Sequence, residues 1–82
     1  MILSSPKPKS HDGRVPKGRQ VRKAIEKAGW QLVRIRGSHH VYRKSSRIEV
    51  FAYHDTADLS GPRLAIIAKQ FEMTLDELRD LL

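Results

Sequence analysis

The chain has 82 residues, and 16 Lys and Arg against 9 Asp and Glu give it a formal net charge of +7 at pH 7. This length provides one small hydrophobic core and excludes a large cofactor-binding fold. The absence of cysteine excludes disulfides, thiolate zinc sites and cysteine nucleophiles. No apolar run approaches the roughly 20 residues of a membrane span, and the first residues lack the apolar segment of a secretory signal. We therefore expect a cytoplasmic protein with no membrane partner.

Positive charge is concentrated in the first half of the chain. Residues 1–47 contain 13 Lys and Arg and 2 acidic residues, whereas residues 48–82 contain 3 Lys and Arg and 7 acidic residues. Nucleic acid is the partner that such a basic half favours, because each neutralised phosphate releases counterions. The alternative is that the charge serves only solubility, with a basic tail that has no fixed structure.

The first predicted elements in chain order are a tail and a helix. Residues 1–16 contain prolines, serines and a glycine that break any periodicity, so we predict a flexible basic tail, with the folded domain at 17–82. Residues 19–28 are predicted to form a helix with Gly29 as its C-terminal cap, since apolar residues recur there at helical spacing. These residues are Val21, Ala24, Ile25 and Ala28. The basic residues expected on the solvated side are Arg19, Arg22, Lys23 and Lys27.

Three segments rich in β-forming residues follow, at 30–36, 39–44 and 47–53. Their short connections predict a three-stranded antiparallel meander. A loop at 54–61 precedes a second helix, which begins near Pro62 and repeats the apolar spacing. Thr74 and Glu77 then form a capping box for a short final helix. The predicted fold class is α+β, with the order α-β-β-β-α of double-stranded-RNA-binding domains and the helices packed on one face of the sheet.

The segment 34–44 contains the residues best suited to chemistry. Two adjacent histidines, His39 and His40, stand there among cations that would bind phosphate and offset its developing charge. RNA supplies its own nucleophile, the 2′-hydroxyl, so one positioned base with cations suffices for a ribonuclease. Successive strand residues point to opposite faces, so one histidine serves a given site, and alternation does not decide which. The alternative is that the pair contributes only to binding.

Metal and stacking sites are less favoured by the pattern. His39, His40, His54 and Asp55 carry ligand atoms, but adjacent strand histidines diverge and no helical HxxxH motif exists, so we predict neither a metal nor a cofactor. Tyr42 and Tyr53 either stack on bases or line the sheet, and we favour the second interpretation.

The region from Gly18 onward resembles the HicA-type mRNA interferase toxins, the YcfA-like family, of bacterial type II toxin–antitoxin systems. Short motifs in the family's order and spacing carry the resemblance. They are Ala28-Gly29-Trp30, Leu32-Val33-Arg34, Gly37-Ser38-His39-His40, Val41-Tyr42-Arg43-Lys44, His54, Leu59, Gly61, Leu64-x-x-Ile67 and Lys69-Gln70. The sequence departs from the family at Lys44-Ser45, at Tyr53 and at Glu72, where relatives often have His-Pro, proline and glycine.

The resemblance implies a metal-independent endoribonuclease that cleaves mRNA and is neutralised by a HicB-type antitoxin. The functional histidine of the family follows the Gly-Ser pair, which makes His39 the expected general base and His40 the second choice. The residues expected to bind RNA phosphate are Arg34, Arg36, Gly37, Ser38, Arg43 and Lys44. The general acid is unassigned among His40, His54 and water. Two alternatives remain open: an RNA-binding module without catalysis, and a domain whose basic face docks an acidic protein.

Overall fold

The computed structural model describes residues 15–82, so the predicted tail at 1–16 lies almost entirely outside the described residues. Its elements are α1 (Gly18–Lys27), β1 (Gln31–Arg36), β2 (His39–Lys44), β3 (Arg47–Phe51), α2 (Gly61–Gln70) and α3 (Leu75–Leu81). This order confirms the predicted α-β-β-β-α fold with a short C-terminal helix. Within residues 15–82, no helix is long and apolar enough to cross a bilayer.

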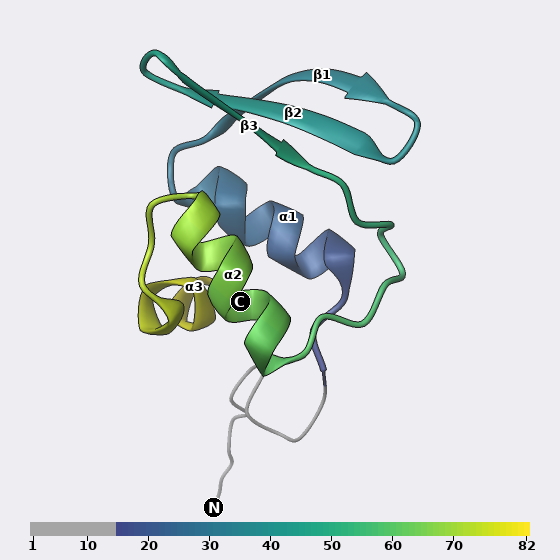
Figure 1. The fold of residues 1–82 in the computed structure, drawn as a ribbon, viewed down its shortest axis with the longest axis vertical. Coiled ribbons are helices and arrows are strands. Elements are labelled where there is room, and N and C mark those ends of the chain that lie inside the picture. Colours follow the sequence, from purple (N-terminus) through teal and green to yellow (C-terminus); the bar gives the residue numbers. More distant parts are fainter. Residues whose placement is uncertain (1–14) are drawn as a thin grey trace, which may run out of the picture.

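The three strands form one antiparallel sheet in the order β1-β2-β3, as predicted. All three helices lie on the same side of this sheet (Figure 1). The register pairs Ile35 with His40 and then His40 with Phe51, and it shifts between Leu32 and Arg34, which marks a β-bulge at Val33. The third strand ends at Phe51, two residues earlier than predicted.

The core lies between the helices and the inner face of the sheet. Both predicted helical stripes are buried there, except that Ala28 is only partly buried. Trp30 packs edge-on against Phe71, with ring centroids 5.0 Å apart, and its indole Nε1 donates a hydrogen bond to the Phe71 carbonyl at 3.2 Å. Tyr42 also contributes to the core, which confirms that it lines the sheet and is not free to stack on bases.

Local signals define the helix ends. Gly29 adopts a φ of +103° after α1, as expected of a left-handed cap. The Thr74 hydroxyl accepts a bond from the Glu77 backbone N–H, and the Glu77 carboxylate accepts one from the Thr74 N–H, so the predicted capping box is confirmed. Glu72, which follows the C-cap Phe71 of α2, has a φ of +63°.

The loop after β3 is fastened to the start of α1. The Gly18 N–H donates to the Ala57 carbonyl at 2.8 Å, and the Arg19 N–H donates to the Asp55 carbonyl at 3.0 Å. A side chain at Gly18 would overlap the carbonyl oxygen of His54, so only glycine permits this approach. The contact fixes His54 and Asp55 in front of the first residues of β2.

Candidate active site

A groove of about 470 Å³ opens at the end of the β1–β2 hairpin. We call it the histidine groove, and its lining residues are Gly37, Ser38, His40, His54 and Asp55. Two segments meet there: the turn that leads into β2 and the loop that follows β3. The fold therefore gathers one histidine of the predicted pair with a second histidine and a carboxylate from later in the chain.

His40 belongs to the inner face of the sheet and is only 9% exposed. Its ring nitrogen Nδ1 is closed to solvent and has no hydrogen-bond partner within the described part of the chain. Buried polar atoms are nearly always paired, so an orphaned imidazole nitrogen beside a groove is a feature that needs an explanation. Because Nδ1 is closed off, Nε2 is the ring nitrogen left to contact a molecule in the groove.

His39 points to the opposite face of the sheet. It is exposed, it pairs across the strands with Arg36, and it does not line the histidine groove. The structure thus separates the two histidines that the sequence left together, because alternation along β2 sends neighbouring side chains to different faces.

Asp55 supplies an ionised carboxylate to the groove. It accepts two hydrogen bonds from the Arg22 guanidinium, from Nε at 3.0 Å and from Nη2 at 3.1 Å. These bonds hold the pKa of Asp55 below its usual range, and the nearby charges of Arg22, His40 and Arg19 act in the same direction.

Arg22 joins Asp55 to the core. The helical pattern of the sequence predicts this arginine on the solvated side of α1, and that prediction is wrong, because its side chain is only 16% exposed. Its guanidinium also lies 3.7 Å from Glu26, which accepts a hydrogen bond of 2.8 Å from the Tyr42 hydroxyl. Burial, and next the bond to Glu26, raise the pKa of Tyr42 to about 12, so the phenol stays a neutral donor.

The predicted phosphate-binding residues fall into three places. Gly37 and Ser38 line the histidine groove. Arg34, Arg36 and Arg43 are exposed on the outer face of the sheet, with Arg36 directly before the Gly37-Ser38 turn. Lys44 stands at the other end of β2, where its Nζ donates to the Ala28 carbonyl at 3.1 Å.

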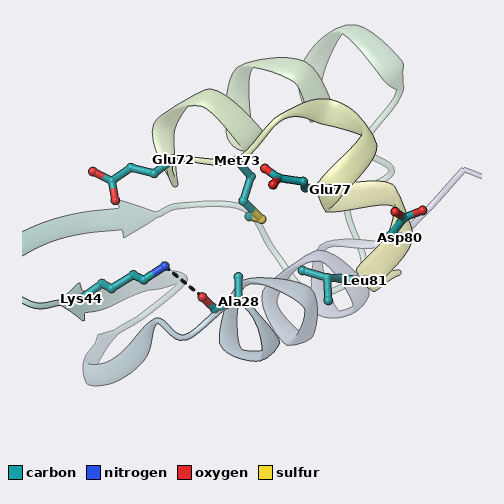
Figure 2. Close-up of a pocket in the computed structure, with 7 residues that line it drawn as sticks. All are labelled: Ala28, Lys44, Glu72, Met73, Glu77, Asp80 and Leu81. Carbon is teal, nitrogen blue, oxygen red and sulfur yellow. Dashed lines mark hydrogen bonds between the residues drawn. The ribbon is translucent and has the colours of Figure 1, made fainter.

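Lys44 borders a second groove of about 350 Å³, whose lining residues are shown in Figure 2 and include no histidine. We call it the acidic groove, and its lining residues are Ala28, Lys44, Glu72, Met73, Glu77, Asp80 and Leu81. Its three carboxylates would repel a phosphate, so the surroundings of Lys44 do not suit the RNA-binding role that the sequence suggested.

The pairing of Arg22 with Asp55 was missed by the sequence analysis. The two residues are 33 positions apart, and no local pattern connects them. The sequence pointed to Asp55 only as a metal ligand, but within residues 15–82 no three His, Cys, Asp or Glu side chains are arranged so that they could hold a metal ion.

Comparison with known proteins places the chain in a family. A family model described as the HicA toxin of bacterial toxin–antitoxin systems matches residues 18–73, which is more than half of the chain. The match contains the whole sheet and all five residues of the histidine groove. No curated protein and no solved structure shows a significant match. The chain belongs to the HicA family and is a toxin of a bacterial toxin–antitoxin system.

Proposed function

We propose that this toxin is a metal-independent endoribonuclease that cleaves mRNA, with His40 as the general base, and that a HicB-type antitoxin neutralises it. The observation that carries the proposal is the position of His40. It is a nearly buried histidine that lines a groove, has an unpartnered ring nitrogen, and lies close enough to the Asp55 carboxylate to influence its pKa.

The chemistry begins at the ribose 2′-hydroxyl. His40 Nε2 takes the hydroxyl proton while the 2′-oxygen attacks the adjacent phosphorus. We assign Nε2 because Nδ1 is closed to solvent. The negative charge of Asp55 stabilises the imidazolium that forms, and the bidentate bond from Arg22 keeps that carboxylate ionised and in place.

The reaction is completed on the leaving oxygen. The bond between phosphorus and the 5′-oxygen breaks, and that oxygen takes a proton from His54, the other histidine of the groove. The products are a 2′,3′-cyclic phosphate and a 5′-hydroxyl. We assign phosphate binding to the backbone of the Gly37-Ser38 turn, which lines the groove, and to Arg36, which directly precedes that turn in the chain.

The sequence favoured His39 as the base, and that assignment competes with His40. Burial beside Asp55 supports His40, whereas His39 is exposed on the far face of the sheet. The deciding experiment measures cleavage of a long single-stranded RNA, with EDTA present, by wild type, His40→Ala and His39→Ala. We expect His40→Ala to lower the rate by about 10²- to 10⁴-fold and to retain RNA binding.

Three results would change the proposal. If only His39→Ala loses cleavage, the general base is His39, on the face of the sheet that points away from the helices. Fragments with linear 5′-phosphates would exclude attack by the 2′-hydroxyl. Salt-sensitive RNA binding by a wild-type protein that does not cleave would favour an RNA-binding module without catalysis.

A further inference from the structure

The face of the sheet that points away from the helices is a mixed apolar and basic surface. We call it the outer face. Because His40 and Tyr42 point inward, their neighbours on β2 point outward, and the cross-strand register extends that face to β1 and β3. Its residues are Val33, Arg34, Arg36, His39, Val41, Arg43, Ile48 and Val50. In the part of the chain that the structure describes, no helix covers it (Figure 1).

The centre of the outer face is aliphatic. Val41 pairs directly with Val50, and Ile48 pairs with Arg43 one step further along. Val33, at the bulge, is 44% exposed, Ile48 is 51% exposed and Val50 is 40% exposed. Single exposed apolar residues are common on proteins, but adjacent ones on neighbouring strands form a patch of the kind that marks an interaction site.

Cations surround this centre on two strands. Arg34 pairs with Val41, Arg36 pairs with His39, and Arg43 lies between Gln31 and Ile48. No ion pair between residues of the described range 15–82 uses any of the three arginines. By contrast, Arg22 and Arg47 are both paired with carboxylates. The outer face therefore combines aliphatic contact area with three cations that these internal carboxylates do not neutralise.

This combination fits an acidic protein better than RNA. Single-stranded RNA binds to aromatic rings on which bases stack, whereas the outer face has no Phe, Tyr or Trp and its apolar side chains are all branched aliphatic. The aromatic residues Trp30 and Tyr42 are in the core. Protein interfaces, by contrast, are built from apolar centres with arginine at high frequency. A second copy of this chain is disfavoured, because stacking two outer faces would bring their arginines together.

We propose that the outer face is the docking surface for an acidic protein partner, the antitoxin of this toxin, whose contacting surface combines aliphatic and carboxylate side chains. This inference rests on the antitoxin half of the proposed function and is independent of catalysis by His40. The Arg36–His39 pair is adjacent to the Gly37-Ser38 turn, so a partner seated on the outer face reaches the rim of the histidine groove. Docking and inhibition of RNA access would then come from one contact.

The test compares two double variants with the same change of charge. Arg34→Glu with Arg43→Glu alters the outer face, and Lys23→Glu with Lys69→Glu alters exposed positions on α1 and α2. The probes are the cognate antitoxin and a 12-nucleotide single-stranded RNA, each titrated into the full chain by calorimetry. We expect the outer-face variant to bind antitoxin at least about 100-fold more weakly and the control variant to stay within about threefold of wild type.

The RNA titration separates the two macromolecules. Both double variants should weaken RNA binding to the same extent, because they change the net charge equally. A selective loss of RNA binding in the outer-face variant, with unchanged antitoxin affinity, would overturn the inference and make this an RNA surface. Equal antitoxin affinity for both variants would also overturn it.

A variant of the aliphatic centre tests the inference independently of charge. Ile48→Thr with Val50→Thr removes apolar area at exposed positions, so the fold should survive, which circular dichroism checks. We expect antitoxin affinity to fall about tenfold and RNA affinity to remain unchanged. An unchanged antitoxin affinity would contradict the inference. If wild type binds antitoxin through this face but does not cleave RNA, catalysis fails and the docking surface stands.

Discussion

The two ends of β2 show how one strand face yields two different sites. His40 and Lys44 point to the same side of the strand, with Tyr42 between them in the core. At one end, the loop after β3 brings a histidine and an arginine-bonded carboxylate to His40. At the other end, α3 and the residues that precede it bring three carboxylates near Lys44. The sequence of the strand does not distinguish the two ends, and the neighbouring segments determine the chemistry of each.

The largest effect is expected from a variant that displaces the loop after β3, because this loop completes the histidine groove. Gly18→Ala would push a methyl group into the His54 carbonyl, so α1 and the loop must separate. We expect a loss of about 2–3 kcal/mol in the free energy of unfolding and a fall in cleavage of about 100-fold. Urea unfolding and RNA cleavage measure the two effects.

The matched control for that variant is Gly61→Ala at the start of α2. A methyl group there would meet only the end of the Arg79 side chain, at 3.4 Å. Unfolding free energy and cleavage should both stay near the wild-type values, since a flexible guanidinium can move aside. Equal behaviour of the two alanine variants would show that the contact at Gly18 does not position the groove.

A smaller change removes the charge of Asp55 and leaves the backbone in place. Asp55→Asn should lower cleavage about tenfold, because the carboxylate no longer offsets the positive charge that develops on His40. Its cost in stability should be only about 1 kcal/mol, because the Asp55 side chain is 44% exposed and water screens the pair. The control is Asp58→Asn, which changes another aspartate of the loop after β3 and breaks its exposed ion pair with Lys17. This variant should leave cleavage unchanged.

The pH dependence of the unfolding free energy gives a second test of the Asp55 carboxylate. The pKa of Asp55 is lower in the folded protein than its ordinary value of 3.8, so its contribution is complete above that value and is lost as pH falls below it. The difference in unfolding free energy between wild type and Asp55→Asn should therefore be constant at neutral pH and narrow as the pH falls below 3.8, which urea unfolding measures. A stability difference that persists at the acidic end would contradict the assigned role of the carboxylate.

Arg36, at the end of β1, and Lys44, at the end of β2, are expected to differ in effect. Arg36→Gln should weaken cleavage about fivefold, because the variant loses one phosphate contact. Lys44→Gln should stay within about twofold, because this lysine caps the end of α1 among carboxylates. The slope of RNA affinity against salt concentration checks both variants, and a larger effect at Lys44 would reverse the assignment of the two grooves.

The smallest effect is expected at Glu72, in the acidic groove. Its φ of +63° is unfavourable for a residue with a Cβ atom, and its carboxylate pairs with Arg47 at 2.8 Å. Glu72→Gly and Glu72→Ala both remove the ion pair, but only glycine relieves the backbone, so the glycine variant should be about 1 kcal/mol more stable. Thermal unfolding measures the difference, and cleavage should be unchanged in both.

Predictions from the sequence were accurate where the cause is local. The helix stripes, the Gly29 cap and the Thr74–Glu77 capping box depend on residues within one or two turns, and all are confirmed. The meander is also confirmed, because short connections leave few alternatives. The one clear boundary difference is the end of β3, where the alternating pattern continues past the last strand residue, Phe51.

Predictions were incomplete where contacts join distant residues. The bond between Arg22 and Asp55 links α1 to a loop 33 positions later, and a solvated helix face was the natural expectation for that arginine. Lys44 likewise looked like part of one continuous basic segment. Its actual neighbours come from the C-terminal third of the chain, which strand periodicity does not describe.

The sequence by itself determined the fold class, the family resemblance and the segment at 34–44 as the place to look for chemistry, because periodicity, caps and short motifs act between near neighbours. Only the tertiary structure decided which histidine lines a groove and which cations surround it. The physical reason is that alternation fixes the relative faces of adjacent residues, whereas the packing of helices and loops determines which face is inside. That packing puts His40 beside Asp55 and leaves His39 on the outer face.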